Sequence, residues 1–397
     1  MKDDAPVSAG GLATAAPVGF LVALAVAALL TPLVARLARR IGAVDRVKER
    51  GLAREATPLL GGLAIFAAVL VAALLLVPMS QPTKGILGGA AVVTAVGALD
   101  DWRELAAPAK LAGQVAAALV LVLSGVSVDV VTLPFLGRVE FDQAGDVLTL
   151  IGLVAVMNVV NFSDGIDGLA AGVCAISAAA FAVIAFDLGK ESAGVLAAIT
   201  AGAALGFLVH NFHPASVFMG DCGSNLLGLL LGGVIVEGSL KTNALIALIV
   251  PLVVLAVPFL DTGFVVAKRI KYRRPVYRAD SNHFHHRFHR IGFSQRRTVL
   301  YLYGWTVTMA GLAVALRFVP YSDRGDLDFG WSLVMALCFA LALAASVYLV
   351  LVLEILKLRR LRGWQLRHAD PDTSEHEIDA EVERELETGE FRALDPK

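Results

Sequence analysis

Long stretches without a charged side chain constrain the fold of this chain more than any other feature. Eleven stretches lack aspartate, glutamate, lysine and arginine, and a membrane-spanning helix needs ~20 apolar residues. Charged residues make up 17% of the chain, against about 25% in soluble proteins, which excludes a soluble, disordered or nucleic-acid-binding protein. We therefore predict an all-α polytopic membrane protein with about eleven transmembrane helices, at 16–35, 59–83, 85–99, 111–128, 147–163, 168–186, 192–220, 222–236, 242–260, 298–316 and 329–353.

The lysines and arginines are distributed unevenly over the loops between these stretches. Of 34, 27 lie in loops after odd-numbered stretches or in the C-terminal tail, and 7 lie on the other side. Because basic residues are retained in the cytoplasm, this split predicts an N-terminus outside and a cytoplasmic C-terminus. We expect residues 1–356 to form a domain in the inner (plasma) membrane, and residues 357–397 to form a cytoplasmic tail that is first basic and then acidic.

Two segments outside the apolar stretches carry local signals of their own. The outside loop 128–146 alternates around Gly137 in the pattern of a β-hairpin. The acidic tail is expected to be solvated and partly helical over 375–386.

Polar side chains gather at the ends of the apolar stretches on the predicted cytoplasmic side. Ionisable residues at membrane depth are costly, so each is a candidate functional residue. The predicted outside loops carry no comparable group in the sequence. The candidates are Asp100 and Asp101 after the third stretch, Asn158, Asn161, Asp164 and Asp167 around the fifth junction, Asn211, His213 and Asp221 around the seventh, and Asp261, His283, His285, His286 and His289 after the ninth.

Carboxylates and amides that converge on one face form an oxygen-rich site. Mg²⁺ prefers oxygen ligands and commonly bridges phosphate oxygens. The loop 268–297 adds arginines and histidines that can stabilise a transferring phosphoryl group, although such a loop can also contact anionic lipids and a histidine cluster can bind a transition metal. Together these features suggest phosphoryl transfer at a membrane surface. Two alternatives fit the sequence less well. A transporter would need polar residues on both faces of the membrane, whereas here they gather on one. A structural membrane anchor would give no reason for polar clusters at three separate junctions.

Five segments of the chain resemble the polyprenyl-phosphate N-acetylhexosamine-1-phosphate transferases, and they occur in the order typical of that family. The third and fourth segments are the most specific. The segments are 57–62 (TPLLGG), 97–101 (GALDD) followed by Lys110, 158–170 (NVVNFSDGIDGLA), 217–224 (VFMGDCGS) and 279–287 (ADSNHFHHR).

The resemblance implies a reaction in which a polyprenyl phosphate attacks the β-phosphorus of a UDP-N-acetylhexosamine and UMP leaves. Mg²⁺ is the implied cofactor, with Mn²⁺ as a substitute. The pattern His283-Phe-His-His286 followed by Arg287 resembles the branch that uses UDP-N-acetylglucosamine and undecaprenyl phosphate to start cell-envelope polysaccharides. The alternative is the phospho-N-acetylmuramoyl-pentapeptide transferase branch of peptidoglycan synthesis. Membrane lipids are the other expected partners, no nucleic acid is expected, and the sequence is compatible with a homodimer.

The resemblance also implies roles for individual residues. Asp221 and Asn161 would bind the metal, with Asp164 nearby. Asp100 would activate or position the lipid phosphate, and Asp101 would support the metal site. The residues implied to act on the substrates have different roles. Asn158 binds substrate, and the uridine is held by Asp167, Asn211 and Phe218, while Lys110 assists. The sugar-phosphate end is clamped by His283, His285, His286 and Arg287.

Overall fold

The computed structural model describes eleven ranges of the chain, and the statements below concern them alone. They form two compact units, the first built from α1 to α8 and part of α12, the second from the remaining elements. The predicted span 242–260 lies outside the described residues. These residues are 9–45, 57–128, 130–133, 137–238, 294–318, 322–323, 326–327, 329–354, 363, 366–367 and 374–388.

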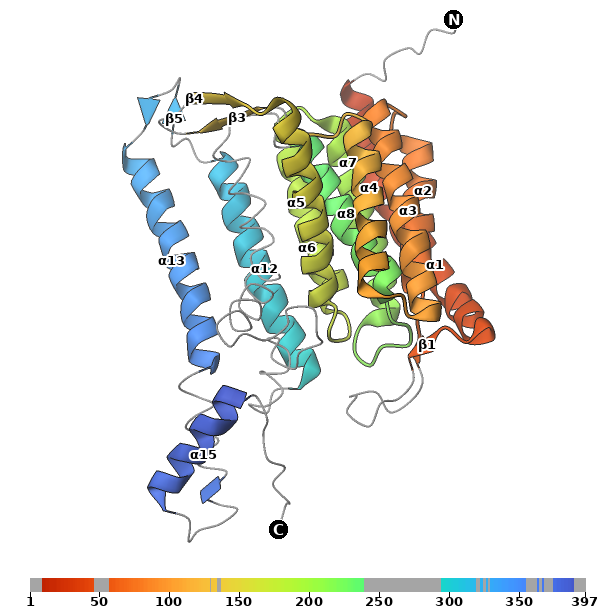
Figure 1. Cartoon of the computed structure of the whole chain (residues 1–397). Helices are drawn as coiled ribbons and strands as arrows, with labels where there is room; N and C mark the ends of the chain where they lie inside the picture. Colours follow the sequence, from red (N-terminus) through yellow and green to blue (C-terminus); the bar gives the residue numbers. More distant parts are fainter. Residues whose placement is uncertain are drawn as a thin grey trace, which may run out of the picture. The chain divides into compact units, whose positions relative to one another are not determined.

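Helices dominate both units (Figure 1). The first unit contains α1 (Ala9–Ile41), α2 (Gly61–Leu76), α3 (Gln81–Arg103), α4 (Ala107–Leu123), α5 (Asp142–Ser163), α6 (Leu169–Asp187), α7 (Glu191–Asn211) and α8 (Gly220–Gly238). Further along the chain lie α12 (Gln295–Phe318), α13 (Phe329–Glu354) and α15 (Glu375–Thr388).

Six of these helices, α1, α3, α5, α6, α7 and α12, are long and apolar enough to cross a membrane, and α2, α4 and part of α13 are shorter apolar helices. The fold is therefore that of a polytopic helical membrane protein. The total of eleven spans and the orientation of the termini stay predictions.

Three short antiparallel pairs of strands connect the helices. The pair β3 (Val130–Leu133) and β4 (Gly137–Glu140) confirms the hairpin predicted around Gly137, and α15 confirms the helical segment predicted in the acidic tail. The other pairs join β1 (Val44–Asp45) to β2 (Thr57–Pro58) and β5 (Ser322–Asp323) to β6 (Asp326–Leu327).

Several helix ends differ from the predicted spans for local reasons. The span predicted at 59–83 ends at Leu76, because Val77 is extended, as residues before a proline tend to be. The next helix begins at Gln81, where the Ser80 side chain accepts a hydrogen bond from the backbone N–H of Thr83. It runs past the predicted residue 99, so that Asp100 and Asp101 form part of its last turn.

Helix α8 lies at the centre of the first unit, where it packs against α3, α5, α2, α6 and α7. Almost all of its residues are buried. Small residues let the backbones approach closely: a side chain at Gly62 of α2 would overlap the backbone of Gly223, and one at Gly97 of α3 would overlap that of Cys222. The first turn of α8 is therefore fixed between α2 and α3.

Candidate active site

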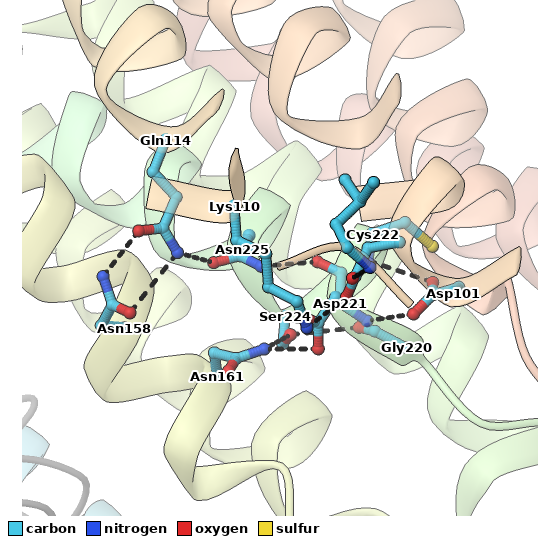
Figure 2. Close-up of polar contacts among 12 residues, drawn as sticks. Asp101, Lys110, Gln114, Asn158, Asn161, Gly220, Asp221, Cys222, Ser224 and Asn225 are labelled. Carbon is cyan, nitrogen blue, oxygen red and sulfur yellow. Dashed lines mark hydrogen bonds and ion pairs between the residues drawn. The ribbon is translucent and has the colours of Figure 1, made fainter. Parts of the chain in front are cut away.

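The polar junctions predicted from the sequence meet at one end of the first unit, where α3, α5 and α7 end and α4, α6 and α8 begin (Figure 1). Asp221, in the first turn of α8, connects them. Its Oδ2 accepts a hydrogen bond from Lys110 Nζ of α4 (3.0 Å), and its Oδ1 accepts one from Asn161 Nδ2 of α5 (2.9 Å) (Figure 2). Asn161 Nδ2 also donates to Ser224 Oγ (2.8 Å).

Lys110 bridges two carboxylates. Its Nζ lies 2.5 Å from Asp100 Oδ2 and 3.0 Å from Asp221 Oδ2. Asp100 is buried, with 7% of its side chain exposed, whereas the lysine side chain is 39% exposed. The backbone N–H of Leu105 donates to Asp100 Oδ1 (2.7 Å), so the turn between α3 and α4 holds this carboxylate in place. A single ammonium group thus offsets the charge of two acidic groups.

Asp101 contacts backbone groups instead. Its Oδ1 accepts a hydrogen bond from the N–H of Asp221 (2.7 Å), and its Oδ2 accepts one from the N–H of Cys222 (3.2 Å) (Figure 2). Both oxygens of this carboxylate therefore bind the first turn of α8.

A network of three amide side chains lies beside these carboxylates and joins α4, α5 and α8. Gln114 Nε2 donates to Asn225 Oδ1 (2.8 Å), and Asn158 Nδ2 donates to Gln114 Oε1 (2.8 Å) (Figure 2). Asn225 Nδ2 donates in turn to the carbonyl of Asp221 (2.9 Å). Asn158, implied to bind substrate, is therefore also engaged in holding these helices together.

The loop before α6 is held by side chains from two other helices. Asn211 accepts a hydrogen bond from the N–H of Gly168 (3.0 Å) and donates to the carbonyl of Val217 (2.9 Å). The Tyr303 hydroxyl of α12 donates to the carbonyl of Gly168 (2.5 Å). Asp167 Oδ2 contacts His213 Nδ1 (2.7 Å). Asn211 and Asp167, both implied to hold the uridine, thus fix the loop before α6 and the loop after α7.

Phe218 and Asp164 complete the described part of the predicted site. The half-buried Phe218 is fixed through its backbone, since its N–H donates to the carbonyl of Pro58 (2.9 Å) and its carbonyl accepts from Gly61 (3.1 Å). Asp164 ends α5. Burial, followed by the negative charges of Asp221, Asp101 and Asp167, raises the pKa of Asp164 to about 7.

Comparison with known proteins identifies the family. The model of glycosyl transferase family 4 matches residues 83–239. A Bacillus subtilis protein named "Probable undecaprenyl-phosphate N-acetylglucosaminyl 1-phosphate transferase" is 37% identical over 289 residues, which cover 72% of this chain and 80% of that protein. The chain belongs to glycosyl transferase family 4. The resemblance drawn from the five sequence motifs is thereby confirmed.

Other family 4 relatives fall into two groups by name. The Mycolicibacterium smegmatis "Decaprenyl-phosphate N-acetylglucosaminephosphotransferase" is 39% identical over 72% of this chain and 78% of its own length. The Desulforamulus reducens "Phospho-N-acetylmuramoyl-pentapeptide-transferase" is 32% identical over 77% of this chain and 96% of its own length.

The described residues of this family 4 protein include a group of carboxylates that could hold a metal ion. One oxygen each from Asp100, Asp101 and Asp221 lies within 4.8 Å of the others. The set implied by the resemblance, Asp221, Asn161 and Asp164, shares only Asp221 with this group. Lys110 pairs with Asp100 and Asp221, and Asp101 lies in the same group, so three carboxylates share one ammonium, and oxygen donors of this kind suit a hard divalent cation.

Some candidates fall outside this description, and some contributors were missed by the sequence reasoning. Asp261 and the loop residues His283, His285, His286, His289 and Arg287 lie outside the described residues. Gln114, Asn225 and Tyr303 were not predicted. The signal for the two amides was present, because each is a polar side chain within an otherwise apolar stretch, but an uncharged amide does not interrupt a charge-free stretch.

Proposed function

We propose that this protein transfers N-acetylglucosamine 1-phosphate from UDP-N-acetylglucosamine to undecaprenyl phosphate or a related polyprenyl phosphate. The product, a polyprenyl-diphosphoryl N-acetylglucosamine, would start a cell-envelope polysaccharide. The observation that carries the proposal is the group formed by Asp100, Lys110 and Asp221, in a chain whose N-acetylglucosamine relatives are 37–39% identical.

The reaction exchanges one phosphorus–oxygen bond for another. An oxygen of the lipid phosphate forms a bond to the β-phosphorus of the donor. The bond between this phosphorus and the oxygen that bridges to the α-phosphorus breaks, and that oxygen leaves with UMP. The second pKa of a phosphate monoester is about 6, so most of the nucleophile is already ionised at neutral pH. Alignment and charge neutralisation therefore contribute more than proton removal.

Asp100 and Lys110 are placed to act on the lipid phosphate. Lys110 carries the positive charge of the described cluster, and its partly exposed ammonium is 2.5 Å from Asp100 and 3.0 Å from Asp221. We assign to Lys110 the binding of phosphate oxygens and to Asp100 the orientation of that ammonium. Asp100 would also accept a proton from the fraction of lipid phosphate that arrives protonated.

Asp221 and Asn161, with Asp164 nearby, would hold Mg²⁺, for which Mn²⁺ can substitute. A divalent cation there would neutralise charge on the donor's diphosphate. Asn161 restrains Asp221 through the 2.9 Å hydrogen bond to its Oδ1. We further assign Asp167, Asn211 and Phe218 to the uridine side, and the loop that contains His283, His285, His286 and Arg287 to the sugar-phosphate end.

We place the site on the cytoplasmic face of the plasma membrane, where UDP-sugars are present. The 27-to-7 division of lysine and arginine supports this orientation. A cysteine at Ser281, introduced after Cys174, Cys222 and Cys338 are replaced, should resist an impermeant thiol reagent in intact cells. Labelling of this cysteine from outside would contradict the predicted orientation.

The reaction is tested with purified protein, undecaprenyl phosphate, Mg²⁺ and a panel of UDP-sugars, with UMP release as the measured quantity. We expect release with UDP-N-acetylglucosamine and its loss on chelation of the metal. UMP release that does not depend on the lipid phosphate would indicate hydrolysis and would refute transfer.

The alternative donor is UDP-N-acetylmuramoyl-pentapeptide, because relatives named for that transfer are 32–35% identical and match over 95–96% of their own length. The motif at 283–287 argues against it, because the muramoyl-pentapeptide branch usually has three consecutive histidines followed by an acidic residue. Here Phe284 separates His283 from the next two histidines, and Arg287 follows them. A bulky lactyl-peptide would have to fit beside these side chains. A steric clash or an unpaired buried group excludes a substrate more strongly than a missing contact does.

A further inference from the structure

The two adjacent aspartates at the end of α3 have different kinds of partner. Asp100 contacts the Lys110 ammonium and the N–H of Leu105. Asp101 accepts hydrogen bonds from the backbone N–H groups of Asp221 and Cys222, 120 and 121 residues further along the chain. Two neighbouring carboxylates with the same chemistry are thus placed for different tasks.

The first turn of α8 needs an acceptor from elsewhere in the fold. The first N–H groups of a helix have no partner within the helix, and a preceding Ser, Thr, Asp or Asn usually supplies one. The residues before Asp221 are Met219 and Gly220, and neither has a side-chain oxygen. Asp101 of α3 provides both of its oxygens instead, and its negative charge is also favourable at the positive end of the helix.

The surrounding backbone leaves room for this carboxylate and for little else. Gly220 has a φ of +73°, and a β-carbon built on it would overlap the carboxylate of Asp101. Gly97, one turn before Asp101, lies against the backbone of Cys222, and Gly62 lies against that of Gly223. Helices α2 and α3 therefore lie against the first turn of α8 on two sides.

We propose that Asp101 is a positioning residue: it caps α8 from another helix and so fixes where the carboxylate of Asp221 lies relative to Lys110 and Asn161. In this assignment Asp101 binds neither substrate nor metal ion. The effect that we expect Asp101 to have on turnover rests on the proposed function, whereas the effect that we expect it to have on the order of α8 does not.

The first test is hydrogen–deuterium exchange of the full-length protein in detergent, without metal or substrate. In Asp101→Ala, the amides of Asp221 and Cys222 lose their acceptors, so we expect a peptide that spans 219–226 to exchange at least tenfold faster. Peptides from α6 should be unchanged. Unchanged exchange at 219–226 would overturn the proposal, because a residue that served only as a metal ligand would not protect these amides.

The second test compares substitutions at Asp101. Asparagine keeps one acceptor oxygen for the N–H of Asp221 but turns its own NH₂ donor toward the N–H of Cys222, whereas alanine keeps neither acceptor. We therefore expect Asp101→Asn to retain more kcat than Asp101→Ala and to keep part of the amide protection. Equal loss of kcat in both variants, with protection retained in Asp101→Asn, would assign Asp101 a direct part in the chemistry and refute the positioning role.

A third variant approaches the same contact from α8. Gly220→Ala places a methyl group against Asp101, and it should also speed exchange at 219–226. Its matched control is Gly189→Ala, because Gly189 has a φ of +70° and nothing within 4 Å of a built β-carbon. That control suffers the same backbone strain without the contact, so we expect unchanged exchange at 219–226.

These measurements separate the two proposals even if one fails. If wild-type protein releases no UMP but Asp101→Ala exchanges faster at 219–226, the cap stands and the proposed function fails. If Asp101→Ala does not fold, Asp101→Asn and Gly220→Ala still test the proposal. Exchange at 219–226 in Gly220→Ala that is as slow as in wild type would contradict it.

Discussion

The two ends of the helices in the first unit use polar side chains differently. At the end that carries the candidate site, Asp221 alone accepts hydrogen bonds from residues 60 and 111 positions earlier in the chain and donates one, through its backbone N–H, to a residue 120 positions earlier. At the opposite end, the Ser80 side chain accepts a hydrogen bond from the N–H of Thr83 in the helix that it caps. The Thr149 hydroxyl of α5 accepts one from the N–H of Val128 in the preceding loop. Polar groups at the first end join four helices, whereas those at the second end mostly fix local turns.

The ion pairs show the same contrast. At the opposite end, Asp187 of α6 meets the single cation Arg317 of α12 at 2.5 Å, and each side chain is about 30% exposed. At the site end, Lys110 is shared by Asp100 and Asp221, with Asp101 and Asp164 close by. A balanced pair stabilises structure, whereas an excess of carboxylates favours a bound cation, which can in turn bind phosphate oxygens.

Replacement of Asp221 should have the largest effect of any single change. Asp221→Asn removes one negative charge and changes the partners of both Lys110 and Asn161, so we expect turnover to fall ~100-fold or more, while a cooperative thermal transition remains. The matched control is Asp187→Asn at the opposite end, which should keep more than half of wild-type UMP release. Activity above a tenth of wild type in Asp221→Asn would contradict the assignment.

Lys110 offers the next largest effect. Lys110→Met leaves two carboxylates without their shared cation, so turnover should fall by roughly 30-fold and stability by about 1–2 kcal/mol, the latter reduced by the partial exposure of the lysine. Lys110→Arg keeps the charge and should recover part of both, as measured by UMP release and thermal unfolding in detergent. The assignment fails if the methionine variant turns over like wild type.

The amide network should give a smaller effect. Gln114→Leu removes the hydrogen bonds to Asn225 and Asn158, and unsatisfied buried amides cost about 1–3 kcal/mol. We expect a loss of stability of that size and a roughly tenfold fall in turnover, because Asn225 also holds the carbonyl of Asp221. Gln114→Glu keeps the oxygen that accepts from Asn158 but removes the N–H that donates to Asn225, so it measures the effect of losing that donor alone. Stability and turnover equal to wild type in the leucine variant would show that the network is dispensable.

The ion pair at the opposite end should matter least. Arg317→Met should lower stability by no more than about 1 kcal/mol, since both partners are partly exposed, and should leave UMP release within twofold of wild type. A tenfold loss of turnover in this variant would mean that the two ends are not functionally distinct.

The sequence predicted the helical, membrane-spanning fold because an uncharged stretch of ~20 residues has few other solutions. It also placed Asp100, Asp221 and Asn161 at junctions that the structure brings within hydrogen-bonding distance of shared partners. It did not reveal the partners of Asp101, because these are backbone N–H groups 120 and 121 residues away, and backbone groups leave no trace in a residue pattern.

Helix ends and amides were harder to predict for a related reason. Charge-free stretches mark where lipid is tolerated, so they did not show that α7 ends at Asn211, where Phe212 turns extended. Gln114, Asn225 and Tyr303 lie inside helices whose composition is dominated by apolar residues. Their roles depend on which helices pack together, and only the three-dimensional structure supplies that information.

The most direct test of the account offers the purified protein two donors in competition. UDP-N-acetylglucosamine and UDP-N-acetylmuramoyl-pentapeptide are supplied at equal concentration with undecaprenyl phosphate and Mg²⁺, and the lipid products are separated and weighed by mass spectrometry. We predict that undecaprenyl-diphosphoryl N-acetylglucosamine is the main product and that Asp221→Asn forms almost none of it. A main product that carries the muramoyl-pentapeptide would contradict the assigned donor, and no lipid-linked product from either sugar would contradict the transfer itself.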